Sequence, residues 1–266
     1  MKSPLSLEVI SRDPVGSPKP TPIVFVHGAW HGAWCWEENF LPAFAQAGYP
    51  VTAFSLRAHG RSPTNKSIRF LRIGDYLADL DSIIQQIGTP PILIGHSMGG
   101  YIVQKYLETH PLPAGILLAS IPLPGALPFV LRHTLRHPWP MLKTLLTFNG
   151  YEVVRTPALA KDAFFSDSLP DETAARYHAR LNSESTLIIL DSSLFARIRS
   201  SRIQSPMLVI GAANDRVFTV AEQESMARAY GSAAHILPNT AHDLMLERNW
   251  RSAVEIILAW LRDHSL

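Results

Sequence analysis

Residues 92–100 read Ile-Leu-Ile-Gly-His-Ser-Met-Gly-Gly, and this stretch decides how the rest of the chain is interpreted. The apolar residues 92–94 are typical of a buried strand, and residues 101–108 have a helical pattern. Between them, Gly-His-Ser-Met-Gly at 95–99 has the form of a tight strand-to-helix turn, which lifts a serine hydroxyl to the carboxyl edge of a sheet. A glycine-rich turn with a passive serine is the alternative. The flanking strand and helix favour Ser97 as a nucleophile.

Short runs that are apolar on both faces recur along the chain and alternate with segments of helical periodicity. Such runs are typical of strands in a parallel sheet that is covered on both sides. Among the helical segments, 73–87 ends at Gly88, Thr219 and Glu222 form a possible capping box, and Asn249 is placed to cap the last helix. We expect strands at 23–26, 51–56, 91–94, 115–119, 207–210 and 234–237. Repeated strand–helix–strand units predict an α/β fold with a mostly parallel sheet flanked by helices.

One region, residues 121–205, breaks this alternation. It opens with prolines at 122, 124 and 128 and then shows only helical patterns. We expect helices at about 129–148, 172–181 and 184–198. The sequence therefore predicts a core formed by residues 1–120 and 206–266, with a helical cap at 121–205 inserted between two core strands.

A serine of ordinary pKa is a weak nucleophile and needs a base. Where a serine stands on such a turn, the acid and the histidine follow it after later strands. Of the 11 histidines, His242 alone comes late enough in the chain and at a strand end. Asp215 follows the strand at 207–210 and is the expected partner that orients His242. Asp243, next to the histidine, and Asp191, in the cap, are less well placed.

Attack by Ser97 on a carbonyl would also need donors for the developing oxyanion. The backbone N–H of Met98, directly after the nucleophile, is one expected donor. The other should come from the loop after an early strand, where His-Gly-Ala-Trp at 27–30 follows the strand at 23–26. There Ala29 is the expected donor, and Gly28 allows the backbone to approach the substrate closely.

Substrate contacts are less clearly marked. Trp30, Trp34 and Gly28 are candidates in the first loop, although the tryptophans could equally pack in the core. His96, inside the turn, is a further candidate, and a structural role suits it better. The apolar and basic residues at 127–148 could form a lid that touches lipid, but a solvated helix face over an apolar pocket is the favoured interpretation.

Composition excludes several classes of protein. The chain has 266 residues, 47% hydrophobic and 17% charged, with a net charge of +2, so neither a disordered chain nor a nucleic-acid-binding protein is expected. A single cysteine, Cys35, and the spacing of the histidines predict no metal site, and no cofactor motif is present.

No apolar run predicts membrane insertion, and residues 1–10 do not resemble a signal peptide, so a cytoplasmic protein is expected. The oligomeric state is left open.

Ser97, Asp215 and His242, together with His-Gly at 27–28, resemble the α/β-hydrolase superfamily. That resemblance implies a sheet of about eight strands. The longer motif at 27–36, His-Gly-Ala-Trp-His-Gly-Ala-Trp-Cys-Trp, is similar to a subgroup that holds plant methyl-esterases, hydroxynitrile lyases and bacterial carboxylesterases.

Two positions depart from the lyases of this subgroup. Those enzymes typically carry threonine where Gly28 stands, and lysine where Asp243 follows the catalytic histidine. The lysine is the group that would stabilise a departing cyanide, so its replacement by an acid favours hydrolysis. Related dehalogenases and epoxide hydrolases use an aspartate nucleophile, whereas this chain has Ser97. The resemblance thus implies a serine hydrolase that cleaves small to medium apolar or aromatic carboxylic esters. A lipase, lysophospholipase or thioesterase with the same triad is the alternative, and a slow or non-catalytic receptor for a small ligand is another.

Overall fold

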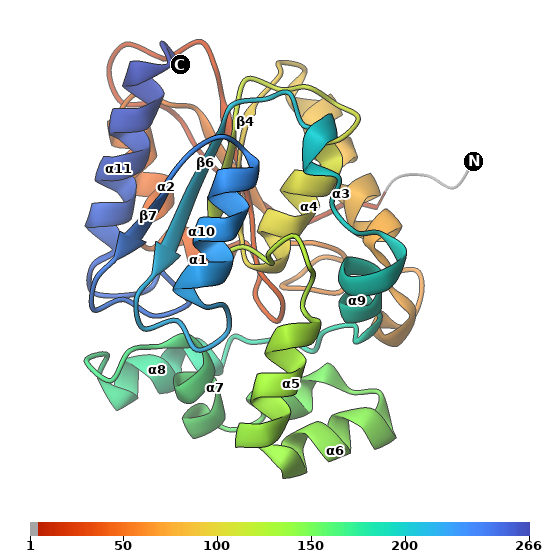
Figure 1. The fold of residues 1–266 in the computed structure, drawn as a ribbon. Coiled ribbons are helices and arrows are strands. Elements are labelled where there is room, and N and C mark those ends of the chain that lie inside the picture. Colours follow the sequence, from red (N-terminus) through yellow and green to blue (C-terminus); the bar gives the residue numbers. More distant parts are fainter. Residues whose placement is uncertain (1–4) are drawn as a thin grey trace.

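The computed structural model describes residues 5–266, which fold around one seven-stranded sheet (Figure 1). The strand order is β1-β3-β2-β4-β5-β6-β7, in which β1 runs antiparallel to β3 and all other neighbours are parallel. The mostly parallel sheet expected from the sequence is confirmed. The strands are β1 (Val9–Arg12), β2 (Ile23–Val26), β3 (Val51–Phe54), β4 (Ile92–His96), β5 (Gly115–Leu118), β6 (Met207–Ala212) and β7 (Ala234–Leu237).

The expected number of about eight strands is one too high for the described residues. Residues 5–8 form no strand, and the stretch between β1 and β2 holds prolines at 14, 18, 20 and 22. A proline has no N–H to donate to a neighbouring strand, so this stretch cannot add a paired strand. Residues 1–4, part of the stretch in which no signal peptide is expected, lie outside the described residues. No helix in the described part of the chain is long and apolar enough to cross a bilayer.

The central strands bring three loops to one edge of the sheet. Every residue of β2, β4, β5 and β6 is buried, which explains why their sequences do not alternate between apolar and polar. The register pairs Val26 with Gly95, His96 with Leu118, and Leu118 with Ile210. The chain therefore leaves β2, β4 and β6 at neighbouring points of the carboxyl edge.

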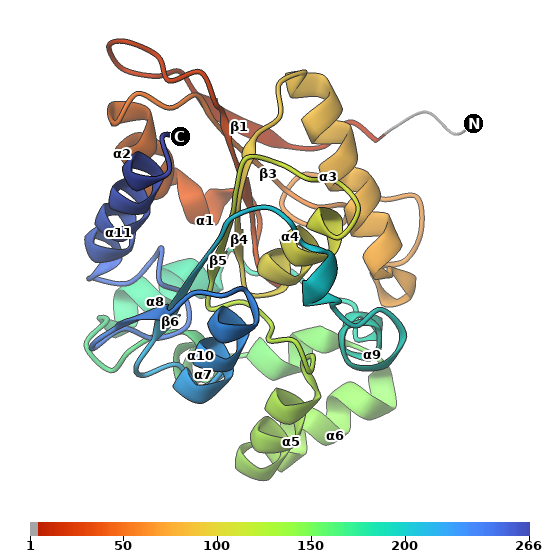
Figure 2. The ribbon, with the colours of Figure 1, turned by 45° about the horizontal axis from the view of Figure 1, so that its top comes forward.

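Helices cover both faces of the sheet (Figures 1 and 2). Helix α3 ends at Gly88 with φ +72°, and Thr219 and Glu222 form the expected capping box of α10. Asn249 stands at the N-cap of α11, but its side chain accepts a hydrogen bond from the Ser252 hydroxyl and not from the backbone. On one face lie α2 (Phe40–Gln46) and α11 (Trp250–Asp263); on the other lie α3 (Ile73–Ile87), α4 (Met98–Leu107) and α10 (Val220–Ala229). Two short elements, α1 (Trp34–Glu37) and η1 (Ile68–Phe70), complete this part of the chain.

Between β5 and β6 the described chain forms helices only, in the segment predicted as a cap. The expected helix at 129–148 is two helices, because Pro138 holds His137 at φ −132° and ψ 66°, outside the helical region. The expected helix at 184–198 is a single turn followed by a π-helical turn. Core side chains hold this stretch: Tyr76 donates to Glu184, Arg72 to Asp191, and Tyr101 to the Ala196 carbonyl oxygen. The elements are α5 (Leu127–Arg136), α6 (Pro138–Thr147), η2 (Gly150–Val154), α7 (Pro157–Phe164), α8 (Asp171–His178), α9 (Leu187–Leu190), η3 (Asp191–Phe195) and η4 (Ser200–Arg202). Helices α5 to α8 lie across the carboxyl end of the sheet (Figures 1 and 2).

Candidate active site

Ser97 occupies a strained turn between β4 and α4. Its backbone has φ +51° and ψ −116°, a conformation that residues with a side chain rarely adopt. A Cβ at Gly95 would lie 2.5 Å from the carbonyl oxygen of Gly99, and one at Gly99 would lie 2.1 Å from that of Val26. Only glycines can therefore flank Ser97 where the turn packs against itself and against β2. Among the described residues the Ser97 hydroxyl has no hydrogen-bond partner, and it opens onto a pocket.

His242 and Asp215 form a buried pair beyond the ends of β7 and β6. Nδ1 of His242 lies 2.9 Å from Oδ2 of Asp215, and both side chains are almost fully buried. Oδ1 of Asp215 accepts the N–H groups of Val217 and Phe218 at 2.7 and 3.0 Å, so the carboxylate cannot turn. Because a carboxylate only accepts, Nδ1 of His242 carries the proton and Nε2 is left free to accept one.

The ring of His242 is held in place from two further sides. Phe164 stacks on it with ring centroids 5.9 Å apart, and Phe218 meets it edge-on at 5.6 Å. Nε2 of His96 donates to the His242 carbonyl oxygen at 3.0 Å. Burial, together with the neighbouring His242, lowers the pKa of His96 to about 3, which keeps that ring neutral. The residue directly before Ser97 thus holds the backbone of His242.

The two expected oxyanion donors lie on the wall of the same pocket. Ala29 and Met98 both line it, and neither N–H donates to an acceptor within residues 5–266. A Cβ at Gly28 would lie 3.0 Å from Cβ of Ser97 and 2.7 Å from Nδ1 of His96, so the first loop passes very close to the nucleophile. The indole N–H of Trp30 donates to the Gly150 carbonyl oxygen at 3.0 Å and ties this loop to the cap.

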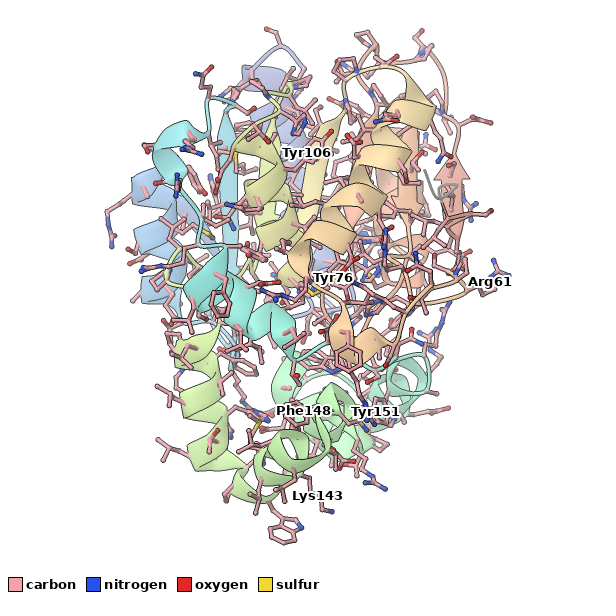
Figure 3. All side chains as sticks on the ribbon, turned by 90° about the vertical axis from the view of Figure 1, so that its right-hand side faces the viewer. Arg61, Tyr76, Tyr106, Lys143, Phe148 and Tyr151 are labelled. Carbon is pink, nitrogen blue, oxygen red and sulfur yellow. The ribbon has the colours of Figure 1, made fainter. Side chains whose placement is uncertain are left out.

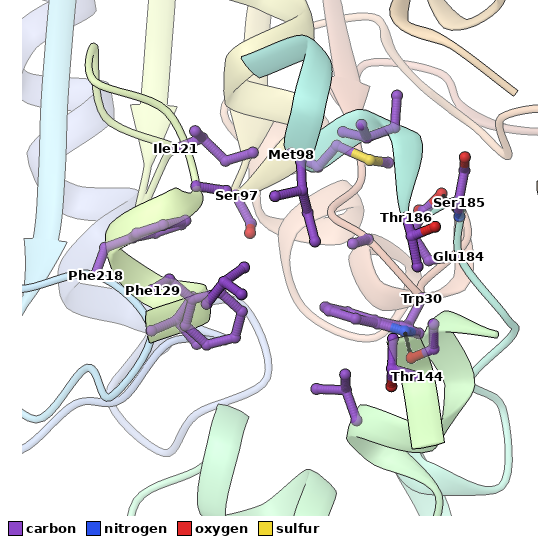
Figure 4. Close-up of a pocket in the computed structure, with 18 of the residues that line it drawn as sticks. Trp30, Ser97, Met98, Ile121, Phe129, Thr144, Glu184, Ser185, Thr186 and Phe218 are labelled. Carbon is purple, nitrogen blue, oxygen red and sulfur yellow. Dashed lines mark hydrogen bonds between the residues drawn. The ribbon is translucent and has the colours of Figure 1, made fainter. Parts of the chain in front are cut away.

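The pocket lies between the sheet edge and the cap, with Ser97 at its base (Figure 4). Its walls are mainly apolar and come from the first loop, α5, α6, η2, α9 and the loop after β6. The lining side chains with polar groups are Trp30, Ser97, Thr144, Glu184, Ser185 and Thr186. Such a pocket suits an apolar or aromatic group next to a polar reacting centre.

Three of the four candidate substrate contacts do not line this pocket. His96 and Gly28 are both buried, and their neighbours Ser97 and Ala29 are the residues that line the pocket. Trp34 packs in the core, where it stacks on His31 and Tyr177, and the Arg180 guanidinium lies over its ring at 4.7 Å. Trp30 is the candidate that does line the pocket, because the chain turns there with φ +65°.

Sequence reasoning missed a second buried aspartate–histidine pair. Nε2 of His31 lies 2.9 Å from Oδ2 of Asp243, and Nδ1 lies 2.7 Å from the carbonyl oxygen of Ala29. Burial alone would lower the pKa of His31, but the charge and hydrogen bond of Asp243 outweigh it and raise that pKa. The imidazolium in turn lowers the pKa of Asp243. The His31–Asp243 pair fixes the loop that carries Ala29, because His31 is also bonded to the Ala29 carbonyl oxygen. In the sequence, His31 stands out only as part of the repeated His-Gly-Ala-Trp at 27–34.

Glu184 is the other residue that the sequence did not reveal. Glu184 lines the pocket, yet it is almost fully buried. Its carboxylate accepts hydrogen bonds from the Tyr76 hydroxyl at 2.7 Å and from the Ser185 N–H at 2.6 Å. Its other oxygen lies 3.1 Å from Nε2 of His59. Burial and this carboxylate raise the pKa of Tyr76 well above its usual value. Glu184 therefore fastens the cap to the core at the edge of the pocket.

One trio in the described part of the chain has the spacing of metal ligands. Ligand atoms of His96, His242 and Asp243 lie within 4.8 Å of one another. Nε2 of His96 is bonded to a carbonyl oxygen, Nδ1 of His242 to Asp215, and Oδ2 of Asp243 to His31. Each side chain of the trio is thus already held by one hydrogen bond within the protein, and we assign no metal to the trio.

Comparison with known proteins agrees with this architecture. The model of the alpha/beta hydrolase family matches residues 23–255. Norfluorocurarine synthase 1 of Strychnos nux-vomica is 34% identical over 113 residues, which are 40% of this chain and 41% of that protein. Methyl jasmonate esterase 1 of Vitis vinifera is 37% identical over 108 residues, 38% of this chain and 40% of that protein. The match thus spans about two fifths of the length of these relatives.

Solved structures extend the likeness to nearly the whole chain. The monoacylglycerol lipase of Paleococcus ferrophilus superposes with a TM-score of 0.72 at 20% identity, over 97% of this chain and 99% of that one. At this identity the likeness concerns the fold alone. With the family model matching most of the sequence, the chain belongs to the alpha/beta hydrolase family.

Proposed function

We propose that this protein is a serine hydrolase that cleaves carboxylic esters through an acyl-enzyme. The observation that carries the proposal is the His242–Asp215 pair at the same edge of the sheet as Ser97. The Ser97 backbone is strained, and its hydroxyl, which has no hydrogen-bond partner among residues 5–266, faces an apolar pocket. Within residues 5–266 the His242 ring is bonded through Nδ1 only, and the free Nε2 is the group that a general base needs.

In the proposed reaction, Ser97 Oγ attacks the ester carbonyl carbon while Nε2 of His242 takes the hydroxyl proton. The carbonyl oxygen becomes an oxyanion and accepts hydrogen bonds from the N–H groups of Ala29 and Met98. The carbon–oxygen bond to the alcohol then breaks, and His242 returns the proton to the departing alcohol. Water, deprotonated by His242, hydrolyses the acyl-enzyme and frees Ser97. Asp215 stabilises the imidazolium that forms in each step.

Two positions support hydrolysis over cyanohydrin cleavage. A threonine at position 28 would bring its Cβ within 2.7 Å of Nδ1 of His96, so this loop is built for glycine. Asp243 is fully buried and paired with His31, and it offers no positive charge to a departing anion. The resemblance to a named methyl jasmonate esterase points in the same direction.

The pocket favours small to medium apolar or aromatic esters. Phe129, Phe218 and Trp30 line the space beside Ser97, and α5 and α6 close it from the far side (Figure 4). A closed roof limits the length of the ligand, and it also excludes water and so strengthens the oxyanion hydrogen bonds. Long-chain lipids and thioesters are the substrates that would indicate a lipase or a thioesterase.

The test is a series of p-nitrophenyl esters of increasing acyl length, from acetate to palmitate, each below its solubility limit. We expect kcat/KM to peak at short or medium chains and to fall for the longest. Matched acyl-thioesters serve as the comparison for a thioesterase. A steady rise of kcat/KM to palmitate would contradict the size preference, and no hydrolysis of any ester by the folded protein would contradict the proposed function.

A further inference from the structure

The exposed apolar side chains of this protein are concentrated in one region. All but three of the large apolar side chains that residues 5–266 expose lie in the cap; the three are Val9, Val15 and Phe70. Soluble proteins rarely expose so many of these side chains together. The apolar face, as we call it, consists of Leu127, Leu131, Leu135, Trp139, Leu142, Leu145, Leu146, Phe148, Leu190, Leu194 and Phe195.

Most of these residues lie on α5 and α6 or directly after α6, and the other three lie on α9 and the turn that follows it. On α5 they recur every fourth position, and further apolar residues follow on α6. Leu135 on α5 is 87% exposed, and Leu146 on α6 is 71% exposed. The turn that carries Leu194 adjoins α5, because the Ser193 hydroxyl accepts the N–H of Leu127 at 3.1 Å. In Figures 1 and 2, α5 and α6 form the end of the molecule that lies farthest from α11 and the amino ends of the strands.

Helices α5 and α6 are apolar on two sides. Their inner sides, with Phe129 and Val130 on α5 and Met141 on α6, line the pocket above Ser97. A helix that covers a core normally turns a polar face to water. The segment 127–148 does cover an apolar pocket with its outer side exposed to solvent, but that outer side presents leucines and a tryptophan. This outer side needs an apolar environment of its own.

The segment that carries most of the apolar face has basic residues and no acidic residues of its own. No Asp or Glu occurs at 122–151 or at 192–214. Arg132 and Arg136 are bridged to Glu222 and Asp162, whereas the Lys143 ammonium lies 5.8 Å from the ring centre of Trp139. Lys143 stands at the outermost end of the cap in Figure 3.

From this arrangement we propose that the apolar face docks the protein on the surface of an anionic lipid bilayer. The leucines and Trp139 would enter the boundary between head groups and acyl chains, and Lys143, with the partly exposed Arg132 and Arg136, would meet lipid phosphates. A second copy of the chain fits less well, because a symmetric contact would set each cationic face against itself. The proposal goes beyond ester hydrolysis: it says where the protein works, whichever ester it cleaves.

The experiment is flotation of the full-length protein with vesicles of phosphatidylcholine alone and of phosphatidylcholine with 30% phosphatidylglycerol. The test variant carries Leu135→Glu and Leu146→Glu, both outside the pocket. The control is Val15→Glu, which places one glutamate on an exposed apolar position away from the cap. Hydrolysis of p-nitrophenyl acetate and molar mass by light scattering are measured for all three proteins.

We expect the wild-type protein and Val15→Glu to float with the anionic vesicles and far less with the neutral ones. The double variant should lose at least fivefold in bound fraction, while it keeps its hydrolysis of the soluble ester. Failure of the wild-type protein to bind anionic vesicles would overturn the proposal. The proposal would also be overturned if light scattering found a dimer for the wild-type protein and a monomer for the double variant. The apolar face would then be a contact between two copies of the chain. Loss of ester hydrolysis in every protein would count against the proposed function alone.

Discussion

Two consecutive copies of the same tetrapeptide, His-Gly-Ala-Trp at 27–30 and at 31–34, differ in what their side chains do. Ala29 and Trp30 of the first copy line the pocket beside Ser97, whereas Trp34 of the second is buried in the core. One repeated sequence thus supplies both the wall of the proposed active site and the support behind it. Its position relative to the sheet edge, and not its composition, decides which role each copy has.

The two histidines of the repeat show how neighbours set the charge of a side chain. Nδ1 of His27 donates to the Gly28 carbonyl oxygen at 2.8 Å, and its Nε2 accepts the Leu56 N–H at 3.0 Å, so this ring is neutral. Burial and the nearby His59 lower its pKa well below the usual value. His31 faces two acceptors, a carbonyl and the Asp243 carboxylate, and is held as an imidazolium.

The largest expected effect separates the two aspartates that partner histidines. Asp215→Asn should lower kcat on the order of 10⁴-fold, because His242 loses the group that fixes its tautomer. Asp243→Asn should lower kcat far less, since Asp243 acts on the loop of Ala29 through His31. Steady-state kinetics on p-nitrophenyl butyrate compares the two variants. Equal losses, or the reverse order, would contradict the assignment of Asp215.

The free energy of unfolding should fall more in Asp243→Asn than in Asp215→Asn, the opposite of the order expected for kcat. Asp243→Asn breaks a buried ion pair and should cost about 3 kcal/mol in the free energy of unfolding. The pKa of His31 is raised, so its contribution is complete below pH 6.5 and is lost as pH rises through the folded value. The pKa of Asp243 is lowered, so its contribution is present above pH 3.8 and is lost as pH falls through the folded value.

The stability difference between wild type and Asp243→Asn should therefore be greatest at about pH 4–6.5 and should shrink above that window. Urea unfolding at several pH values measures it. A difference that does not change between pH 5 and 9 would show that the pair is not ionised in the folded protein. The double variant with His31→Asn, which removes both charges, should lose less than the sum of the single changes.

The glycines of the repeat offer a matched pair of changes. Gly28→Ala places a Cβ 2.7 Å from Nδ1 of His96 and 3.0 Å from Cβ of Ser97, so the nucleophile or the Ala29 donor must move. Misplacement of that size costs about 10²-fold in turnover. At Gly32 the nearest atoms are Ser55 Oγ and Trp34 Cδ1, both at 3.0 Å and farther from the proposed chemistry. Equal losses of kcat in Gly32→Ala and Gly28→Ala would contradict the different roles given to the two copies of the repeat.

The smallest expected effect concerns the tryptophans. Trp30→Phe removes a hydrogen bond to Gly150 and part of the pocket wall, and it should reduce kcat/KM by about fivefold, the equivalent of one hydrogen bond. The indole N–H of Trp34 is buried and has no hydrogen-bond partner in the described part of the chain, so Trp34→Phe should leave kcat/KM unchanged. Equal effects of the two substitutions on kcat/KM would show that Trp30 does not contact the substrate.

Local signals predicted the sheet and the residues at its edge. Fully apolar runs marked the central strands, and the glycines around Ser97 and the position of Asp215 after a strand marked the loops of the site. The cap was predicted less well, because Asp191 and Glu184 are bound by Arg72 and Tyr76 from the core, and no local pattern reveals such contacts. The partner of Asp243 lies 212 positions away in the sequence, beyond the reach of any motif.

The central claim is that Ser97 is the nucleophile, and a fluorophosphonate that modifies activated serines tests it most directly. Intact-mass spectrometry should find one adduct on the wild-type protein and none on Ser97→Ala. Ser185→Ala is the matched control, because this serine also lines the pocket and its hydroxyl is already bonded to the Leu71 carbonyl oxygen. That control should still gain one adduct. Adduct formation that persists in Ser97→Ala, or that disappears in Ser185→Ala alone, would contradict the account.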